Sequence, residues 1–164
     1  MSQQHTPWWH GPRGEWYVVV QFLLFGVIFF APKEAPGLPQ WPAPWSTVGV
    51  GLGLLLGAVG GLLIAAGLLF LGRNLTAVPH PKEDAQFVDR GAYALVRHPI
   101  YSGIIFGALG YGLLWASTLG LFYAFILLVF FDIKTRREEK FLRRKFGSYE
   151  AYATRVRKLI PFLY

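Results

Sequence analysis

The sequence contains three long stretches without a single Asp, Glu, Lys or Arg, at residues 16–30, 44–72 and 98–131. A helix needs roughly 20 apolar residues to cross the hydrocarbon core of a bilayer. The third stretch is long enough for two short helices, and Ser117 and Thr118 allow a tight turn between them. We therefore predict an all-α integral membrane bundle of about four transmembrane helices.

The expected helices span roughly residues 16–30, 46–71, 99–116 and 119–146. The last two form an antiparallel hairpin, and the fourth continues out of the membrane into a C-terminal helical extension. The first would be only about 22 Å long, so a re-entrant or interfacial segment stays open as an alternative. Residues 31–45 carry five prolines and two tryptophans. That composition predicts a loop lying at the membrane surface.

Small residues recur every four positions in the second helix and predict a stripe that another helix can approach closely. They are Gly49, Gly53, Gly57, Gly61 and Ala65. In the third helix, Gly103 and Gly107 have the same spacing and predict a similar close contact.

The cations predict how the chain is oriented. Of the 16 Lys and Arg residues, only Lys33 lies in the loop between the first and second helices. If the chain crosses the membrane four times, the other 15 all lie on the opposite side of the membrane. Lys and Arg accumulate on the cytoplasmic side of membrane proteins. We therefore expect a multi-pass protein with both termini in the cytoplasm, in the inner membrane if the chain is bacterial. The net charge of +7 then marks a basic face at the membrane surface rather than a nucleic-acid site.

We expect residues 1–164 to form a single domain with an N-terminal tail at 1–15. Two polar segments, 72–98 and 132–164, would meet on the cytoplasmic side. The absence of cysteine excludes disulfides, thiolate metal sites and a cysteine nucleophile. The four histidines lack metal-ligand spacing, so no metal site is predicted.

The first polar cluster lies where the third helix begins. Pro99 suits the first turn of a helix, and the free backbone N–H groups beside Arg97 could bind a carboxylate or phosphate. Tyr93 and Tyr101 offer aromatic faces to an adenine or a sulfonium. The alternative is that Arg97 extends to lipid headgroups while His98 only caps the helix.

The second cluster follows the fourth span and contains Asp132, Lys134, Arg136, Arg137, Glu138 and Glu139. Lys134 and Glu138 are four residues apart and share a helix face. Charges at this position are usually solvated anchors. Adjacent acids add nothing to the attraction for an anionic leaflet, however. One of the two could therefore receive an ammonium group or ribose hydroxyls.

Together these motifs resemble the isoprenylcysteine carboxyl methyltransferase and phospholipid methyltransferase superfamily. The matching pattern covers roughly residues 72–164. It consists of Leu71-Gly72-Arg73-Asn74, Gly91-x-Tyr93-x-x-x-Arg97-His98-Pro99-x-Tyr101-x-Gly103, Glu138-Glu139-x-x-Leu142, Phe146-Gly147 and Ile160-Pro161.

The resemblance implies a pocket for S-adenosylmethionine that faces the cytoplasm. The residues it assigns to the cofactor are Phe87, Val88, Tyr93, Arg97, His98, Pro99, Ile100, Tyr101 and Glu138. The catalytic candidates are Lys134, Glu138 and His98, and Glu138 or His98 would act as base for an acceptor that must lose a proton. The family usually has an arginine where this chain has Lys134. A lysine lacks the arginine's two-pronged grip, which weakens the expectation of a carboxylate acceptor.

The predicted function is methyl transfer from S-adenosylmethionine to a lipid-like or small hydrophobic acceptor at the cytoplasmic membrane interface. Two alternatives stay open. The chain could be a catalytically silent membrane accessory protein with the same fold, or a relative of the NADPH-dependent sterol reductases. The identity of the acceptor and the oligomeric state stay open as well.

Overall fold

The computed structural model describes residues 14–38 and 41–164. The predicted N-terminal tail therefore lies outside the described residues, except for Gly14 and Glu15. Within the described part all named elements are helices, and the only β-type pairing is an isolated parallel bridge between Val96 and Arg157. The all-α prediction is confirmed.

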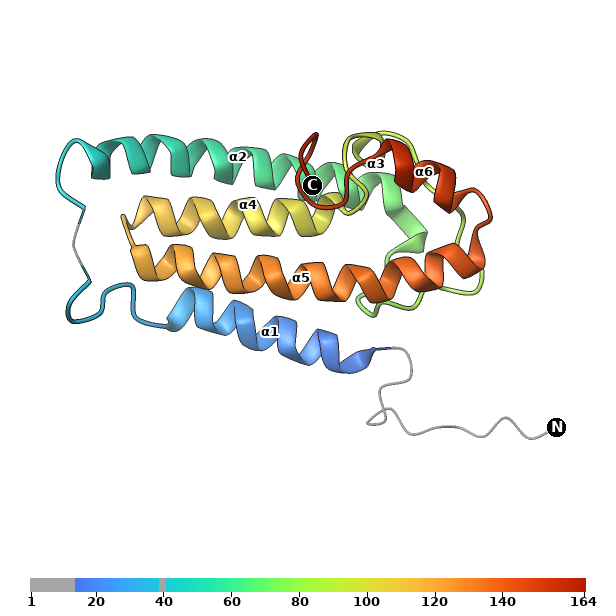
Figure 1. Ribbon diagram of the computed structural model, residues 1–164, viewed down its shortest axis with the longest axis horizontal. Coiled ribbons are helices and arrows are strands. Elements are labelled where there is room, and N and C mark those ends of the chain that lie inside the picture. Colours follow the sequence, from blue (N-terminus) through green and yellow to red (C-terminus); the bar gives the residue numbers. More distant parts are fainter. Residues whose placement is uncertain (1–13, 39–40) are drawn as a thin grey trace.

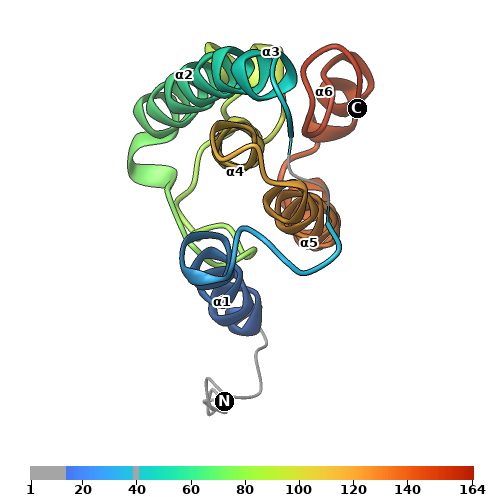
Figure 2. The ribbon, with the colours of Figure 1, turned by 90° about the vertical axis from the view of Figure 1, so that its left-hand side faces the viewer.

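The elements in chain order are α1 (Glu15–Phe30), α2 (Trp45–Leu71), the 3₁₀ turn η2 (Gly72–Asn74), α3 (Ala92–Leu95), α4 (Pro99–Leu114), α5 (Thr118–Lys145) and α6 (Tyr149–Arg155). The four long helices lie side by side (Figure 1). Viewed end-on, α4 lies between α2 and α5, and α1 lies next to α5 (Figure 2). The predicted boundaries agree to within two residues. The sequence did not predict η2 or α3.

Two helices, at residues 45–74 and 118–145, are long and apolar enough to cross a membrane. The other two long helices, α1 and α4, have 16 residues each. At 1.5 Å per residue they measure about 24 Å, which is short for a full span. Large apolar side chains point outward from α1 and α2, among them Phe22, Leu62 and Leu69. In a bilayer these side chains would contact lipid.

The contact between α2 and α4 brings the two backbones together at glycines. A Cβ atom on Gly103 would lie 2.4 Å from the Gly60 carbonyl oxygen, and one on Gly110 would lie 2.7 Å from that of Gly53. No side chain fits at either position. The close approach predicted for these helices is therefore present.

The glycines that make this contact differ in part from the predicted stripe. Gly57 and Gly61 have open space where a Cβ would stand, and so does Gly107 on α4. A spacing of four residues rotates about 40° per step around a helix with 3.6 residues per turn. The stripe therefore leaves the interface. The contact instead continues to Gly60 and Gly67, which are buried.

Polar contacts close the end of the bundle where α4 turns into α5. Ser117 Oγ caps α5 by accepting from the Gly120 N–H at 2.8 Å, and it donates to the Lys33 carbonyl. Trp41 Nε1 donates to Thr118 Oγ1 at 3.0 Å. The loop after α1 is thus fixed to this turn.

At the opposite end the C-terminal segment pairs with the residues that precede α4. The Arg97 N–H donates to the Arg157 carbonyl at 2.7 Å, and the His98 N–H donates to the Lys158 carbonyl at 3.2 Å. The Lys158 ammonium pairs with Asp132 on α5. The start of α4, the C-terminal segment and α5 are therefore held together where the polar clusters lie.

Candidate active site

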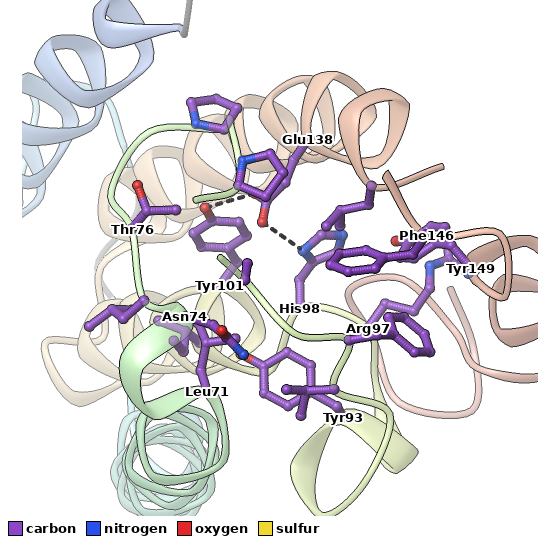
Figure 3. A pocket seen from close by; sticks show the side chains of 18 of the residues that line it. Leu71, Asn74, Thr76, Tyr93, Arg97, His98, Tyr101, Glu138, Phe146 and Tyr149 are labelled. Carbon is purple, nitrogen blue, oxygen red and sulfur yellow. Dashed lines mark hydrogen bonds and ion pairs between the residues drawn. The ribbon is translucent and has the colours of Figure 1, made fainter. Parts of the chain in front are cut away.

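A cavity of about 440 Å³ lies between the N-terminal part of α4 and the C-terminal half of α5 (Figure 3). The segment that connects η2 to α3 forms a further wall. Pockets that bind small molecules have volumes of roughly 300–1,000 Å³. Nine of the predicted site residues line it: Phe87, Val88, Tyr93, Arg97, His98, Ile100, Tyr101, Lys134 and Glu138. The two polar clusters therefore meet around one cavity.

Pro99 is the predicted site residue that does not line the cavity. It occupies the first turn of α4, as expected, and is fully buried. A Cβ on Gly67 would lie 3.2 Å from Pro99 Cγ, so the proline ring packs against α2. Its position indicates a role in starting and seating α4 rather than in holding a ligand.

His98 precedes α4, but its side chain makes no capping hydrogen bond. The imidazole is buried and faces two carboxylates, with Nε2 3.2 Å from Glu139 Oε1 and Nδ1 4.0 Å from Glu138 Oε1. The ring stacks on Tyr101 with 5.7 Å between centroids. His98 thus stands at the N-cap position of α4, but its side chain links the two motifs instead of capping the helix. The backbone N–H groups in the first turn of α4 were expected to be free to bind an anion. The N–H of Ser102 is not free, because it donates to the His98 carbonyl.

Glu138 presents its carboxylate to the cavity. Oε2 accepts from the Tyr101 hydroxyl at 3.0 Å, and 23% of the side chain is exposed. Among the described residues, no Lys or Arg pairs with it within 4.0 Å. A half-buried carboxylate without a fixed cation is suited to an ammonium, a sulfonium or hydroxyl groups from a ligand.

Glu139 has a different role from its neighbour. It accepts from Arg97 Nε at 2.8 Å and is almost fully buried. Arg97 Nη1 donates in addition to the carbonyls of Ala153 (2.9 Å) and Val156 (2.6 Å). Although Arg97 lines the cavity, these donors join α4, α5 and α6, so neither lipid headgroups nor a ligand anion are their partners here. The family resemblance assigned Glu138 to the cofactor, but nothing in the sequence predicted this structural role for Glu139.

Lys134 lies at the α1 side of the cavity and is almost fully buried. Its ammonium donates to Gln21 Oε1 at 2.6 Å and to the Ala77 carbonyl at 3.2 Å. It also lies 4.9 Å from the centre of the Tyr101 ring. Lys134 and Glu138 thus flank Tyr101, one over the ring and the other at its hydroxyl.

Aromatic rings form one wall of the cavity. The Phe87 ring lies 5.5 Å from Phe146, 6.1 Å from Tyr149 and 5.4 Å from Tyr152. The Tyr152 hydroxyl donates to the Tyr93 carbonyl at 2.6 Å and holds α3 in place. Burial raises the pKa of the Tyr93, Tyr149 and Tyr152 phenols well above the usual value, so all three stay protonated. Phenol rings of this kind can stack on an adenine or contact a cation.

Several lining residues were missed by sequence reasoning, and two of them had a signal. Gln21 is a single amide in the apolar run of α1, and polar residues inside membrane helices often mark functional sites. Asn74 belongs to a quoted motif but was given no role. Its side chain pairs in both directions with the Gln86 backbone at 3.0 Å and fixes the segment over the cavity.

The donor set agrees with S-adenosylmethionine, which carries an adenine, a ribose, a sulfonium and an amino acid. Phe87, Tyr93 and Tyr149 supply aromatic surface, and Glu138 supplies a carboxylate without a fixed cation partner. In residues 14–38 and 41–164, no cluster of three or more His, Cys, Asp or Glu is arranged to hold a metal ion.

Known proteins with similar sequences include methyltransferases and metal-resistance proteins. A probable protein-S-isoprenylcysteine O-methyltransferase of Oryza sativa subsp. indica is 31% identical over 134 residues, which cover 79% of this chain and 69% of the rice protein. The cobalt-zinc-cadmium resistance protein CzcN of Cupriavidus metallidurans is 31% identical over 153 residues, covering 92% of this chain and 63% of that protein.

A solved structure has a similar fold. It is that of the eukaryotic intramembrane Ras methyltransferase ICMT (isoprenylcysteine carboxyl methyltransferase), with a TM-score of 0.63 and 26% identity. The match covers 94% of this chain and 54% of that one, so this chain spans about half the length of that enzyme.

The family described as phospholipid methyltransferase matches residues 48–149, more than half of the chain. The match begins earlier than the resemblance inferred from the motifs, because it includes nearly all of α2. The chain therefore belongs to the phospholipid methyltransferase family of membrane methyltransferases.

Proposed function

We propose that this protein transfers a methyl group from S-adenosylmethionine to a lipid-like or small hydrophobic acceptor at the cytoplasmic membrane interface. The single observation that carries the proposal is the convergence of His98, Tyr101 and Glu138 on one cavity of small-molecule size. His98 and Tyr101 belong to the motif at the start of the α4–α5 hairpin, and Glu138 belongs to the motif near its end.

The residues that would hold the cofactor are the aromatic wall and the Glu138 carboxylate. Phe87, Tyr93 and Tyr149 offer ring surface, while Glu138 offers a hydrogen-bond acceptor and a negative charge. When bound, S-adenosylmethionine supplies an activated methyl group on a sulfonium. The family fold and the shape of this cavity both support this assignment.

The chain's own contribution would be alignment and exclusion of water. A positioned pair of reactants can gain several kcal/mol from proximity alone. Lys134, which lines the cavity and contacts Gln21 of α1, would orient the acceptor. An acceptor that must lose a proton would give it to Glu138 or His98, which are 4.0 Å apart.

The acceptor would reach the site from the bilayer. The cavity wall includes Ile100 and Ile104 of α4 and Leu71 of α2, which continue into apolar helix surfaces. We further propose that this face lies on the cytoplasmic side, as the distribution of Lys and Arg predicts.

Two measurements on the purified protein test the proposal. Calorimetry should show binding of S-adenosylmethionine and S-adenosylhomocysteine, and not of NADPH. Incubation with methyl-labelled cofactor and a total lipid and small-thiol extract should then label a lipophilic product. Binding of NADPH alone would favour a reductase. Cofactor binding without any labelled product from lipid acceptors would favour the silent accessory protein.

A further inference from the structure

The ammonium of Lys134 and the carboxylate of Glu138 do not pair, although their positions favour it. The residues are four apart on α5, a spacing at which Lys and Glu side chains commonly meet. None of the ion pairs among residues 14–38 and 41–164 joins them within 4.0 Å. Lys134 is almost fully buried, where an ammonium without a carboxylate partner is costly.

The partners of Lys134 explain the separation. Gln21 of α1 accepts from the ammonium at 2.6 Å, the shorter of its two hydrogen bonds, and the Ala77 carbonyl accepts at 3.2 Å. Both acceptors are uncharged. The two groups also contact different parts of Tyr101: the ammonium lies 4.9 Å from the centre of the ring, and the Glu138 carboxylate accepts from the hydroxyl.

We propose that Gln21 is a positioning residue that holds the Lys134 ammonium away from Glu138 and thereby keeps the Glu138 carboxylate available to the cofactor. The inference rests on the proposed function for the identity of that cofactor. It gives α1 a part in the active site, although α1 lies outside the matched family segment.

Removal of the amide should let the ammonium turn to the nearest carboxylate. In Gln21→Leu, Lys134 loses its closer acceptor and is expected to pair with Glu138 across Tyr101. The carboxylate is then neutralised and partly covered. We expect the affinity for S-adenosylhomocysteine to fall about tenfold, which corresponds to about 1.4 kcal/mol.

A second substitution separates this mechanism from a loss of packing. Gln21→Leu combined with Lys134→Met has no ammonium to pair with Glu138, so affinity for S-adenosylhomocysteine should return to near the wild-type value. Gln21→Glu offers Lys134 a stronger acceptor in the same place and should keep wild-type affinity. Phe22→Leu, at an exposed position of the same helix, is the matched control.

Calorimetry with S-adenosylhomocysteine on the full-length protein in detergent measures all of these variants. Unchanged affinity in Gln21→Leu would overturn the inference, and so would a loss that Lys134→Met fails to restore. If Gln21→Leu does not fold, weakened binding in a folded Gln21→Glu overturns it equally. Failure of the wild-type protein to bind would instead reject the proposed function itself.

Discussion

The two sides of α4 are built in opposite ways. Toward α2, glycines bring the backbones so close that a single added carbon would collide, as at Gly103 and Gly60. Toward α5, at its first turn, α4 borders a cavity whose lining combines charged, aromatic and aliphatic side chains. The helix α4 thus combines a rigid contact that sets its position with a cavity at its first turn that is free to bind a ligand. Substitutions should therefore change stability on one side and ligand affinity on the other.

The largest effect is expected at the ion pair between Arg97 and Glu139, which joins the start of α4 to α5. Arg97→Ala removes the closest cation from the buried Glu139 carboxylate, which keeps only His98 at 3.2 Å and Arg143 at 3.8 Å, and it frees two carbonyls. We therefore expect a loss of about 3 kcal/mol in the free energy of unfolding. Denaturation of the purified protein measures it. The control is Arg136→Ala, which removes an exposed arginine from its pair with Asp132 and should have no measurable effect. Equal losses in the two variants would contradict the assignment.

The next effect tests the side that faces α2. Gly103→Ala forces a methyl group against the Gly60 carbonyl, and overpacking of this kind costs about 1–3 kcal/mol. Thermal unfolding should show the decrease. Gly107→Ala, one turn further along the same helix, meets open space and should not destabilise the protein. Comparable destabilisation at both positions would mean that the contact surface lies elsewhere.

On the other side, Glu138→Gln should act on binding alone. It keeps the size of the side chain and an acceptor for Tyr101, but removes the negative charge that faces the cavity. We expect about a tenfold loss of affinity for S-adenosylhomocysteine with little change in stability. Glu150→Gln, at a 69% exposed side chain, is the control for charge removal. Wild-type affinity in Glu138→Gln would remove Glu138 from the cofactor site.

The smallest effect is a difference in stability between substitutions at two tyrosines of the aromatic wall. Tyr152→Phe removes the hydrogen bond to the Tyr93 carbonyl and should cost about 1 kcal/mol of stability. Tyr149→Phe removes a buried hydroxyl that has no hydrogen-bond partner among the described residues, so it should leave stability unchanged or raise it. Denaturation curves of the pair compare them directly. The opposite order would show that the two hydroxyls have been assigned the wrong roles.

Local sequence was sufficient for most of the fold. Charge-free runs defined the four long helices because the hydrocarbon core of a bilayer tolerates few charges. Pro99 marked the start of α4 correctly, since its ring suits a first turn. The glycine stripe was predicted only in part, because a spacing of four was treated as one face although it rotates around the helix.

The site was predictable where a motif carried it and unpredictable where distant segments meet. His98, Tyr101 and Glu138 were identified from their motifs. They come together because α4 and α5 pack as an antiparallel hairpin, as the sequence predicted. Gln21 comes from a helix more than 100 positions before Lys134, and no local pattern joins the two. The motif assigned Glu138 to the cofactor, but the structural role of Glu139 depends on its contacts with Arg97 and His98, which no local pattern specifies.

The glycine contact between α2 and α4 also limits which parts of the molecule can move. Backbones packed without intervening side chains cannot slide or separate by small steps, since interiors at this density are not continuously deformable. Exchange of ligands with the cavity must then depend on its other walls. These are α1, tied to the site through Gln21, and the connecting segment, held by Asn74. Hydrogen exchange in that segment should be fast while the α2–α4 pair stays protected.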